Sequence, residues 1–145
     1  MLASAGVLGT LYADEIIMNG PLSQIGSIGV MMSIDKKVLK EIQKHTIQLY
    51  SENSERKNEN FKALLRGDEQ PLVNYLTDSD NTFMEMVKEA RGDSMSKENE
   101  EEATSGAMFG ARDGVIMGLA HGVGDMDYVL RRMQILVNNN STNVQ

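Results

Sequence analysis

Residues 28–50 read IGVMMSIDKKVLKEIQKHTIQLY, and this stretch predicts the fold class. Its first part, 28–34, is a short apolar run, and its last part, 46–50, also has the composition of a strand. Between them, residues 36–44 place three apolar side chains on one helical face. Strand, helix, strand is the order of a parallel crossover unit, which predicts an α/β fold with a parallel sheet.

The rest of the chain continues this alternation. A short apolar run at 15–18 ends at the turn residues Asn19-Gly20-Pro21 and predicts another strand. Residues 51–60 are polar without a periodic apolar face and predict a loop. Helices are predicted over four further segments, 4–13, 72–91, around 115–119 and 126–136. The domain is predicted to span 1–137, followed by a polar, disordered tail over 138–145.

Composition limits the class of protein. The 145 residues fit one domain, and the absence of cysteine excludes thiol catalysis and thiolate zinc sites. With 14 basic against 21 acidic side chains the net charge is -7, so nucleic acid is not expected as a partner. No apolar stretch approaches the roughly 20 residues that span a bilayer, so we expect no membrane association. The first basic residue is Lys36, which argues against a secretory leader.

Few residues are candidates for metal or triad chemistry. The only histidines are His45 and His121, which we interpret as surface or capping residues. The acidic run 98–102 is interpreted as a solvated helix start or loop. Nucleophile-elbow and phosphate-loop patterns are absent. Composition and periodicity therefore predict a soluble α/β domain without a metal or cofactor, and nothing more specific.

Two motifs near the start carry a resemblance. The first is SAGVLGTLYADEI at 4–16, and the second is GSIGV at 26–30. Together they resemble the signal peptide peptidase A family of serine peptidases, in the clp/crotonase-like superfamily. In that family a nucleophilic serine opens a helix, an Ala-Asp-Glu-Ile-type segment follows ten residues on, and a Gly-Ser-Ile-Gly-Val strand comes next.

The downstream chain resembles the same family as far as about residue 130. Tyr50-Ser51 and the polar segment with Lys57-Asn58 resemble its lysine loop, and 109–124 resemble its closing segment. Phe109 stands where the family often has tyrosine, and His121 where it often has aspartate. The polar spelling around Lys57 and the lack of a membrane anchor are more similar to the phage and prophage capsid-maturation branch.

The resemblance implies a Ser/Lys dyad, with Ser4 as the nucleophile and Lys57 as the general base. A lysine can act as a base only if its pKa falls far below the ordinary value near 10.4, which a desolvated pocket can achieve. Three nearby carboxylates would oppose this shift and Arg56 would favour it. Alternative interpretations stay open: Ser4 as a plain helix N-cap, Lys57 as an exposed loop lysine, and Lys62 as the base.

The resemblance also implies a glycine-rich segment upstream of the serine that supplies an oxyanion-hole donor. Three residues precede Ser4, so we expect the chain to be the C-terminal portion of a longer protein, or a remnant. By the same resemblance, only the C-terminal part of the parallel sheet and crossover helices is expected.

The resemblance implies an endopeptidase that processes capsid or scaffold polypeptide, bound as an extended strand, in the cytoplasm of a bacterial host. It implies no cofactor, and a homo-oligomer is expected. A second hypothesis is an inactive remnant that acts as a self-associating assembly subunit. A third is an acyl-CoA-binding relative, which the absence of a basic or glycine-rich anion site disfavours.

Overall fold

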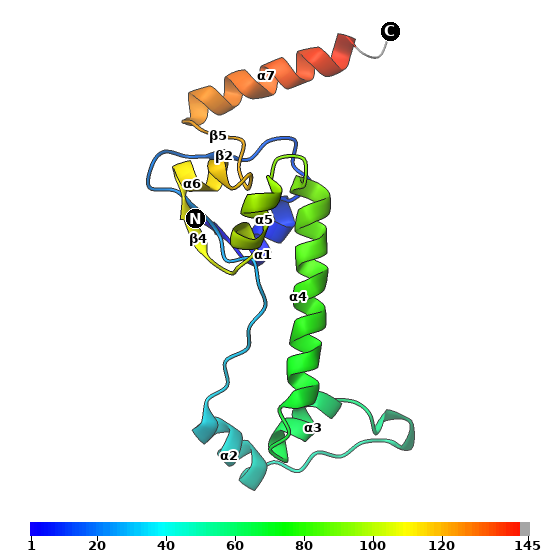
Figure 1. Cartoon of the computed structure of the whole chain (residues 1–145). Helices are drawn as coiled ribbons and strands as arrows, with labels where there is room; N and C mark the ends of the chain where they lie inside the picture. The colour runs from blue at the N-terminus through cyan, green and yellow to red at the C-terminus, as the bar shows by residue number, and fades with distance from the viewer. Residues whose placement is uncertain (143–145) are drawn as a thin grey trace. The chain divides into compact units, whose positions relative to one another are not determined.

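A computed structural model describes residues 1–142, with side chains through residue 139. The chain forms two units. The first combines Met1–Gly29 with the chain from Phe83 onward, and the second is Val30–Thr82. The long helix α4 (Gln70–Arg91) contributes its first part to the second unit and its last part to the first. Figure 1 shows the elements in chain order by colour.

The first unit contains a three-stranded sheet of order β1-β3-β4. The strands are β1 (Leu2–Ala3), β3 (Gln24–Gly26) and β4 (Met108–Gly110). β1 pairs parallel with β3, and β4 pairs antiparallel with the other side of β3. Ile25, at the centre of β3, is fully buried. This arrangement leaves β1 at the edge of the sheet.

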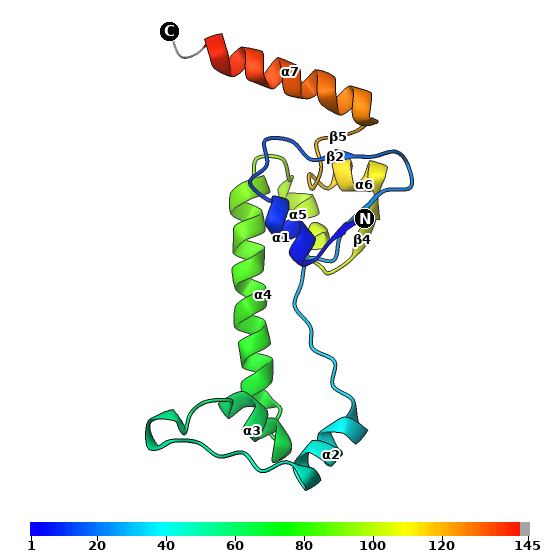
Figure 2. The same ribbon diagram turned by 180° about the vertical axis from the view of Figure 1, so that it is seen from behind.

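A second, two-stranded sheet is also parallel. It pairs β2 (Ile17–Met18) with β5 (Gly122–Val123). The helices of this unit, besides the end of α4, are α1 (Ala5–Thr10), α5 (Lys97–Ala103), α6 (Ala111–Ile116) and α7 (Met126–Thr142). Figures 1 and 2 both show α7 at the end of this unit where β2 and β5 lie.

The core of the first unit is apolar and draws on segments far apart in the chain. Val7 of α1 and Leu11, the residue after this helix, pack into it with Val87 of α4. Its other buried members are Ile16, Met18, Ile25, Ile28, Phe83, Met95, Ala103, Phe109, Ala111, Leu119 and Ala120. Burial of apolar area of this kind is the dominant favourable term in folding. The core therefore fixes the first unit around β1, β3 and α1.

The second unit is built from short helices. They are α2 (Lys36–His45), the 3-10 turn η1 (Glu52–Ser54), α3 (Glu59–Leu65) and the beginning of α4. The Asp35 carboxylate caps α2, since it accepts from the amides of Lys37 and Val38 at 2.6 and 3.3 Å. The amide of Val30 donates to the Asp80 carboxylate at 2.9 Å.

The second unit has almost no interior. Ala63 is the one buried side chain among residues 30–82, all of which the structure describes. Large apolar side chains here are exposed instead, among them Met31 at 79%, Ile47 at 86% and Leu49 at 90%. With so little apolar area buried, packing contributes little to the stability of this unit.

Two of the predicted strands are wrong. Residues 28–34 form no strand, and the strand lies earlier, at Gln24–Gly26. Residues 46–50 are unpaired, so the predicted crossover unit does not form. Both segments have the composition of strands, but a strand also needs a partner for its backbone groups. Ile28 is buried although it does not belong to a paired strand. The amide of the preceding residue, Ser27, donates to the Ala107 carbonyl at 2.7 Å.

Other predictions are confirmed. The α/β class with parallel pairing is correct, and α2 and α4 lie within a residue or two of their predicted bounds. The helix α7 continues to Thr142, so the first part of the predicted tail is helical. Residues 143–145 of that tail lie outside the described residues. None of the helices in the described part of the chain is long and apolar enough to cross a membrane.

Candidate active site

Ser4 sits in a sharp turn between a strand and a helix. It follows β1 directly and stands at the N-cap of α1, with φ 52° and ψ -122°. A positive φ is uncommon for a residue other than glycine, and with this ψ it is the geometry of a tight turn rather than an ordinary N-cap. Residues held in such conformations cluster at active sites, where the surrounding structure sustains the strain.

The hydroxyl of Ser4 is left available. The residue is exposed, and its side chain makes no capping hydrogen bond to α1. Its backbone is well anchored, because its carbonyl accepts from the amides of Val7 and Leu8 at 2.9 and 3.2 Å. The plain N-cap interpretation would require the hydroxyl to accept an amide of the first turn. Ser4 therefore stands at the N-cap position of α1, but its side chain does not cap the helix.

The second sequence motif lies against the first. The amide of Ser4 donates to the Gly26 carbonyl at 3.0 Å, in line with the parallel register of Ala3 opposite Gly26. Gly26 has φ 136°, and a Cβ there would lie 2.3 Å from the Ala107 carbonyl oxygen. Only glycine fits this close approach. Ser27 follows with φ 53°, so a second strained serine lies one residue from the carbonyl that holds Ser4.

Lys57, the predicted base, lies in the second unit. It belongs to the turn after η1, where its amide donates to the Ser54 carbonyl at 3.0 Å. Its side chain is exposed and makes no ion pair or hydrogen bond with the described residues. It lines an open cavity of about 460 Å³ together with Gln48, Leu49, Tyr50, Ser51, Ser54 and Asn58. Ser4 belongs to the first unit, so the two predicted residues come from different units.

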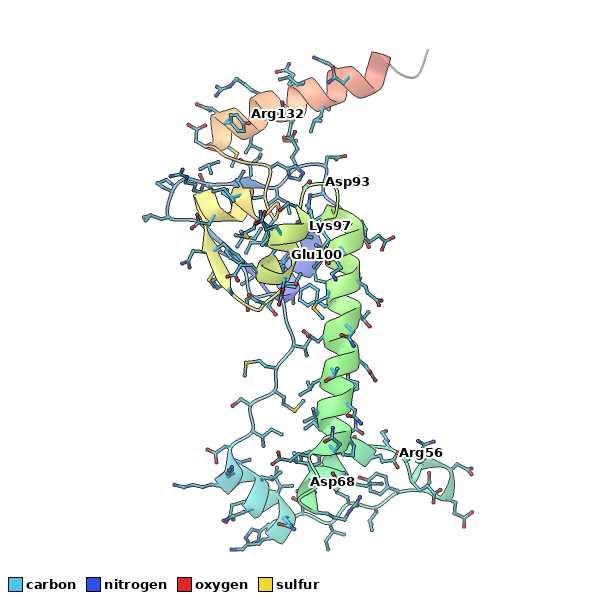
Figure 3. All side chains as sticks on the ribbon, in the orientation of Figure 1. Arg56, Asp68, Asp93, Lys97, Glu100 and Arg132 are labelled. Carbon is cyan, nitrogen blue, oxygen red and sulfur yellow. The ribbon has the colours of Figure 1, made fainter. Side chains whose placement is uncertain are left out.

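Neighbouring basic residues are already engaged. Lys62 donates its ammonium group to the Glu55 carbonyl, and its Nζ lies 3.6 Å from the centroid of the Tyr50 ring. Arg56, labelled in Figure 3, pairs with Glu59 at 3.2 Å. Of the two lysines that could serve as the base, Lys57 is the one whose amine is not committed to such contacts.

A buried arginine that the sequence did not single out lies at the other end of α1. Arg91, the last residue of α4, is only 4% exposed. Its Nη2 donates to the Thr10 carbonyl at 3.4 Å, and its Nη1 lies 3.2 Å from Nε2 of His121. Its Nε has no partner among the described residues. A guanidinium at this end is favourable for α1, because helix carbonyls are unsatisfied there.

His121 lies between this arginine and the second sheet. Its amide donates to the Ile16 carbonyl at 2.8 Å, and its Nδ1 accepts from the Ile16 amide at 2.8 Å. Since Nδ1 accepts, the neutral ring carries its proton on Nε2, which faces the Arg91 guanidinium. The interpretation of His121 as a surface or capping residue is therefore incomplete, because the residue is exposed but its Nδ1 accepts from the Ile16 amide.

The surroundings of His121 lower its pKa from the ordinary value of 6.5. Partial desolvation of the ring, whose Nδ1 faces the Ile16 backbone although the residue as a whole is exposed, is the largest cause, and the charge of Arg91 is the second. The carboxylate of Glu15 and the Ile16 bond act in the opposite direction. Glu15 is itself held by Arg132 of α7, whose Nε donates to it at 3.0 Å. This ion pair lowers the pKa of Glu15.

Acidification is expected to destabilise the protein through His121. In the unfolded chain the His121 ring binds its second proton at a higher pH than in the folded protein, because the pKa of His121 is lower in the folded protein. The stabilisation linked to the neutral His121 ring is therefore complete above about pH 6.5. It is lost as the pH falls through the pKa that His121 has in the folded protein. We expect urea denaturation midpoints to decrease from pH 7.5 to pH 5. His121→Asn should flatten this dependence; an unchanged slope in His121→Asn would contradict the assignment.

The first unit thus offers an exposed hydroxyl on a rigid turn, and the second offers an uncommitted amine beside a cavity. The motif spelling was the signal that identified Ser4 and Lys57. Ser27 lies in the second motif, but its positive φ could not be read from it, and Arg91 carried no signal because its contacts join residues far apart in the chain.

Comparison with protein families identifies a relationship. A family model described as Peptidase family S49 matches residues 1–140, which is nearly the whole chain. A search of curated proteins finds no match.

Proposed function

Because this chain belongs to peptidase family S49, a family of serine peptidases, we propose that Ser4 is its nucleophile and Lys57 its general base. The observation that carries the proposal is the conformation of Ser4, an exposed hydroxyl at φ 52° between a strand and a helix. Strand, strained serine and helix is also the arrangement of the nucleophile elbow in other hydrolases. This conformation supports a nucleophile over a helix cap.

In the proposed reaction the neutral amine of Lys57 takes the proton of the Ser4 hydroxyl. The Ser4 oxygen bonds to the carbonyl carbon of the substrate, and the proton passes to the leaving amine as the peptide bond breaks. Water then hydrolyses the acyl-enzyme and regenerates the serine. The family resemblance also implies an oxyanion-hole donor on a glycine-rich segment before the nucleophile, and we propose that full activity requires it.

We further propose that the substrate is a polypeptide bound as an extended strand. β1 is one of the two edge strands of its sheet, and Ser4 follows it immediately. A peptide hydrogen-bonded along this edge would pass the Ser4 hydroxyl, and main-chain bonds would tolerate many sequences. This position supports an endopeptidase.

We propose capsid or scaffold polypeptide in a bacterial cytoplasm as the substrate, because the polar lysine segment resembles that of the phage and prophage branch. The proposal includes no cofactor. A self-associating assembly subunit without activity is the second candidate, favoured by the single buried side chain of residues 30–82.

A fluorophosphonate probe separates these candidates, because it labels only an activated serine. We expect wild-type protein to be labelled, Ser4→Ala to lose the label, and Ser27→Ala to keep it. Ser27 is the matched control, since it too is a serine at positive φ on the neighbouring strand end. Folded wild-type protein that resists the probe would favour the assembly subunit.

The choice of base is tested by two lysine variants in the same segment. Lys57→Met should reduce the labelling rate by about 100-fold or more, as expected for removal of a general base. Lys62→Met removes a charge five residues away and should reduce it little, because Lys62 is engaged with Glu55 and Tyr50. Equal losses in both variants would contradict the assignment of Lys57.

A further inference from the structure

The helix α7 carries an apolar stripe whose side chains are more than half exposed in the described part of the chain. Met126, Leu130, Met133 and Val137 are 69%, 55%, 56% and 62% exposed. Their spacings of four, three and four residues place them on one side of the helix. This is the spacing of the seam in a two-stranded coiled coil. We call these four residues the α7 seam.

A different side of α7 holds the helix to its unit. Tyr128 lies against Gly124, where a Cβ would approach its ring to 2.4 Å, and Arg132 pairs with Glu15. Figure 3 labels Arg132 on this helix. Both residues are partly buried, as are Val129 and Leu136. At 100° per residue the mean direction of this side is well over 90° from the α7 seam, so docking does not cover the seam.

The α7 seam is complementary to itself. Its spacing reads the same in both directions, so two antiparallel copies place Met126 opposite Val137 and Leu130 opposite Met133. The flank of the seam carries Asp127 and Gln134. In the antiparallel arrangement the Asp127 carboxylate of each copy comes beside the Gln134 amide of the other, which can donate to it.

Charge also favours antiparallel pairing. Each copy carries a net charge of -7, and each unit is attached at the N-terminal end of α7. In this register the two attachment points, at residue 126 of each copy, lie about 16 Å apart along the helix axis, beyond the screening length of about 8 Å at physiological salt. Parallel pairing would bring the two like-charged units together.

We propose that the α7 seam is the contact between two copies of this chain, joined as an antiparallel helix pair. The seam is smaller than the roughly 800 Å² that each partner buries in a standard stable interface. We therefore expect a dimer that dissociates on dilution, with a dissociation constant of roughly micromolar or weaker. The contact does not involve Ser4, so it is independent of the peptidase proposal.

Disulfide trapping tests both the contact and its direction, because the chain has no cysteine of its own. Met126→Cys mixed with Val137→Cys should give a mixed disulfide under mild oxidation. Met126→Cys alone should not cross-link, because the two copies of residue 126 would be about 16 Å apart along the helix, beyond disulfide reach. Met126→Cys that cross-links readily to itself, or a mixture that does not cross-link, would overturn the antiparallel contact.

Sedimentation equilibrium provides a test without oxidation. Wild-type protein should show a monomer–dimer equilibrium below about 0.5 mM, and Leu130→Glu should shift it at least tenfold towards monomer. Ile135→Glu is the matched control on the same helix, because Ile135 is 47% exposed but lies off the seam. Ser4→Ala should dimerise as wild type does. A wild-type protein that stays monomeric, or a dimer insensitive to Leu130→Glu, would overturn the proposal.

Discussion

Ser4→Gly should abolish peptide hydrolysis and stabilise the folded protein at the same time. The variant has no hydroxyl, so we expect the rate to fall by at least about 10⁴-fold, as for other serine nucleophiles. Stability should rise because φ 52° with ψ -122° strains serine but not glycine. Relief of such strain is worth about 1–3 kcal/mol, from which the extra entropy of glycine in the unfolded chain removes about 0.5–1 kcal/mol.

The comparison variant is Ser4→Ala, which loses the hydroxyl but keeps the Cβ and its strain. It should be as inactive as Ser4→Gly, with an unfolding free energy close to that of the wild type. Chemical denaturation of the three proteins measures the difference, and we expect Ser4→Gly to be the most stable by about 1 kcal/mol. If Ser4→Gly were less stable than Ser4→Ala, the backbone at this turn would not be strained.

Gly26→Ala should be among the most destabilising single substitutions in the chain. The new Cβ would lie 2.3 Å from the Ala107 carbonyl oxygen and 3.2 Å from Cα of Met108, both backbone atoms that cannot rotate away. β3 and β4 would have to separate, and the Gly26 carbonyl that accepts the Ser4 amide would move with them. We expect a loss of about 3 kcal/mol or more, which lowers the melting temperature by roughly 10 °C.

Gly67→Ala is the matched control for this substitution. Gly67 also has a positive φ, 83°, but no atom lies within 4 Å of the Cβ that alanine would add. Gly67→Ala should therefore cost only the free energy of placing alanine at a positive φ, about 1 kcal/mol. Calorimetry of the two variants separates steric contact from backbone preference. Equal losses would show that β3 and β4 can part at little cost.

Helical periodicity predicted α2 and α4 well because it depends on the segment itself, whereas α3, which begins inside the segment predicted as a loop, was missed. The apolar faces of 36–44 and 72–91 have the period of a helix, and the Asp35 cap and the Arg91-Gly92 end are local signals. Strand composition was less informative. Residues 46–50 alternate apolar and polar side chains, yet no strand pairs with them, and pairing depends on distant segments that composition does not specify.

In the candidate site, too, the sequence predicted what depends on a local motif and missed what depends on contacts between distant segments. Ser4 could be named from its motif, and the turn that exposes it follows from β1 pairing with Gly26. The Arg91 contact with Thr10 joins residues 81 positions apart, so no local pattern could have indicated it. Likewise, His121 could be located by its departure from the family spelling, but its bond to the Ile16 amide follows from the pairing of β2 with β5.

Because residues 30–82 have almost no interior, most of their positions should tolerate substitution. A side chain that touches few atoms constrains few substitutions, and exposed positions usually change the folding free energy by no more than about 0.5 kcal/mol. Residues of this segment can therefore be exchanged with little penalty to folding, apart from Ala63, the cap at Asp35 and Gly67 with its positive φ. Any invariance found there among descendants of this gene would have to be ascribed to chemistry or to a binding surface, and Lys57 is the position where that criterion applies most directly.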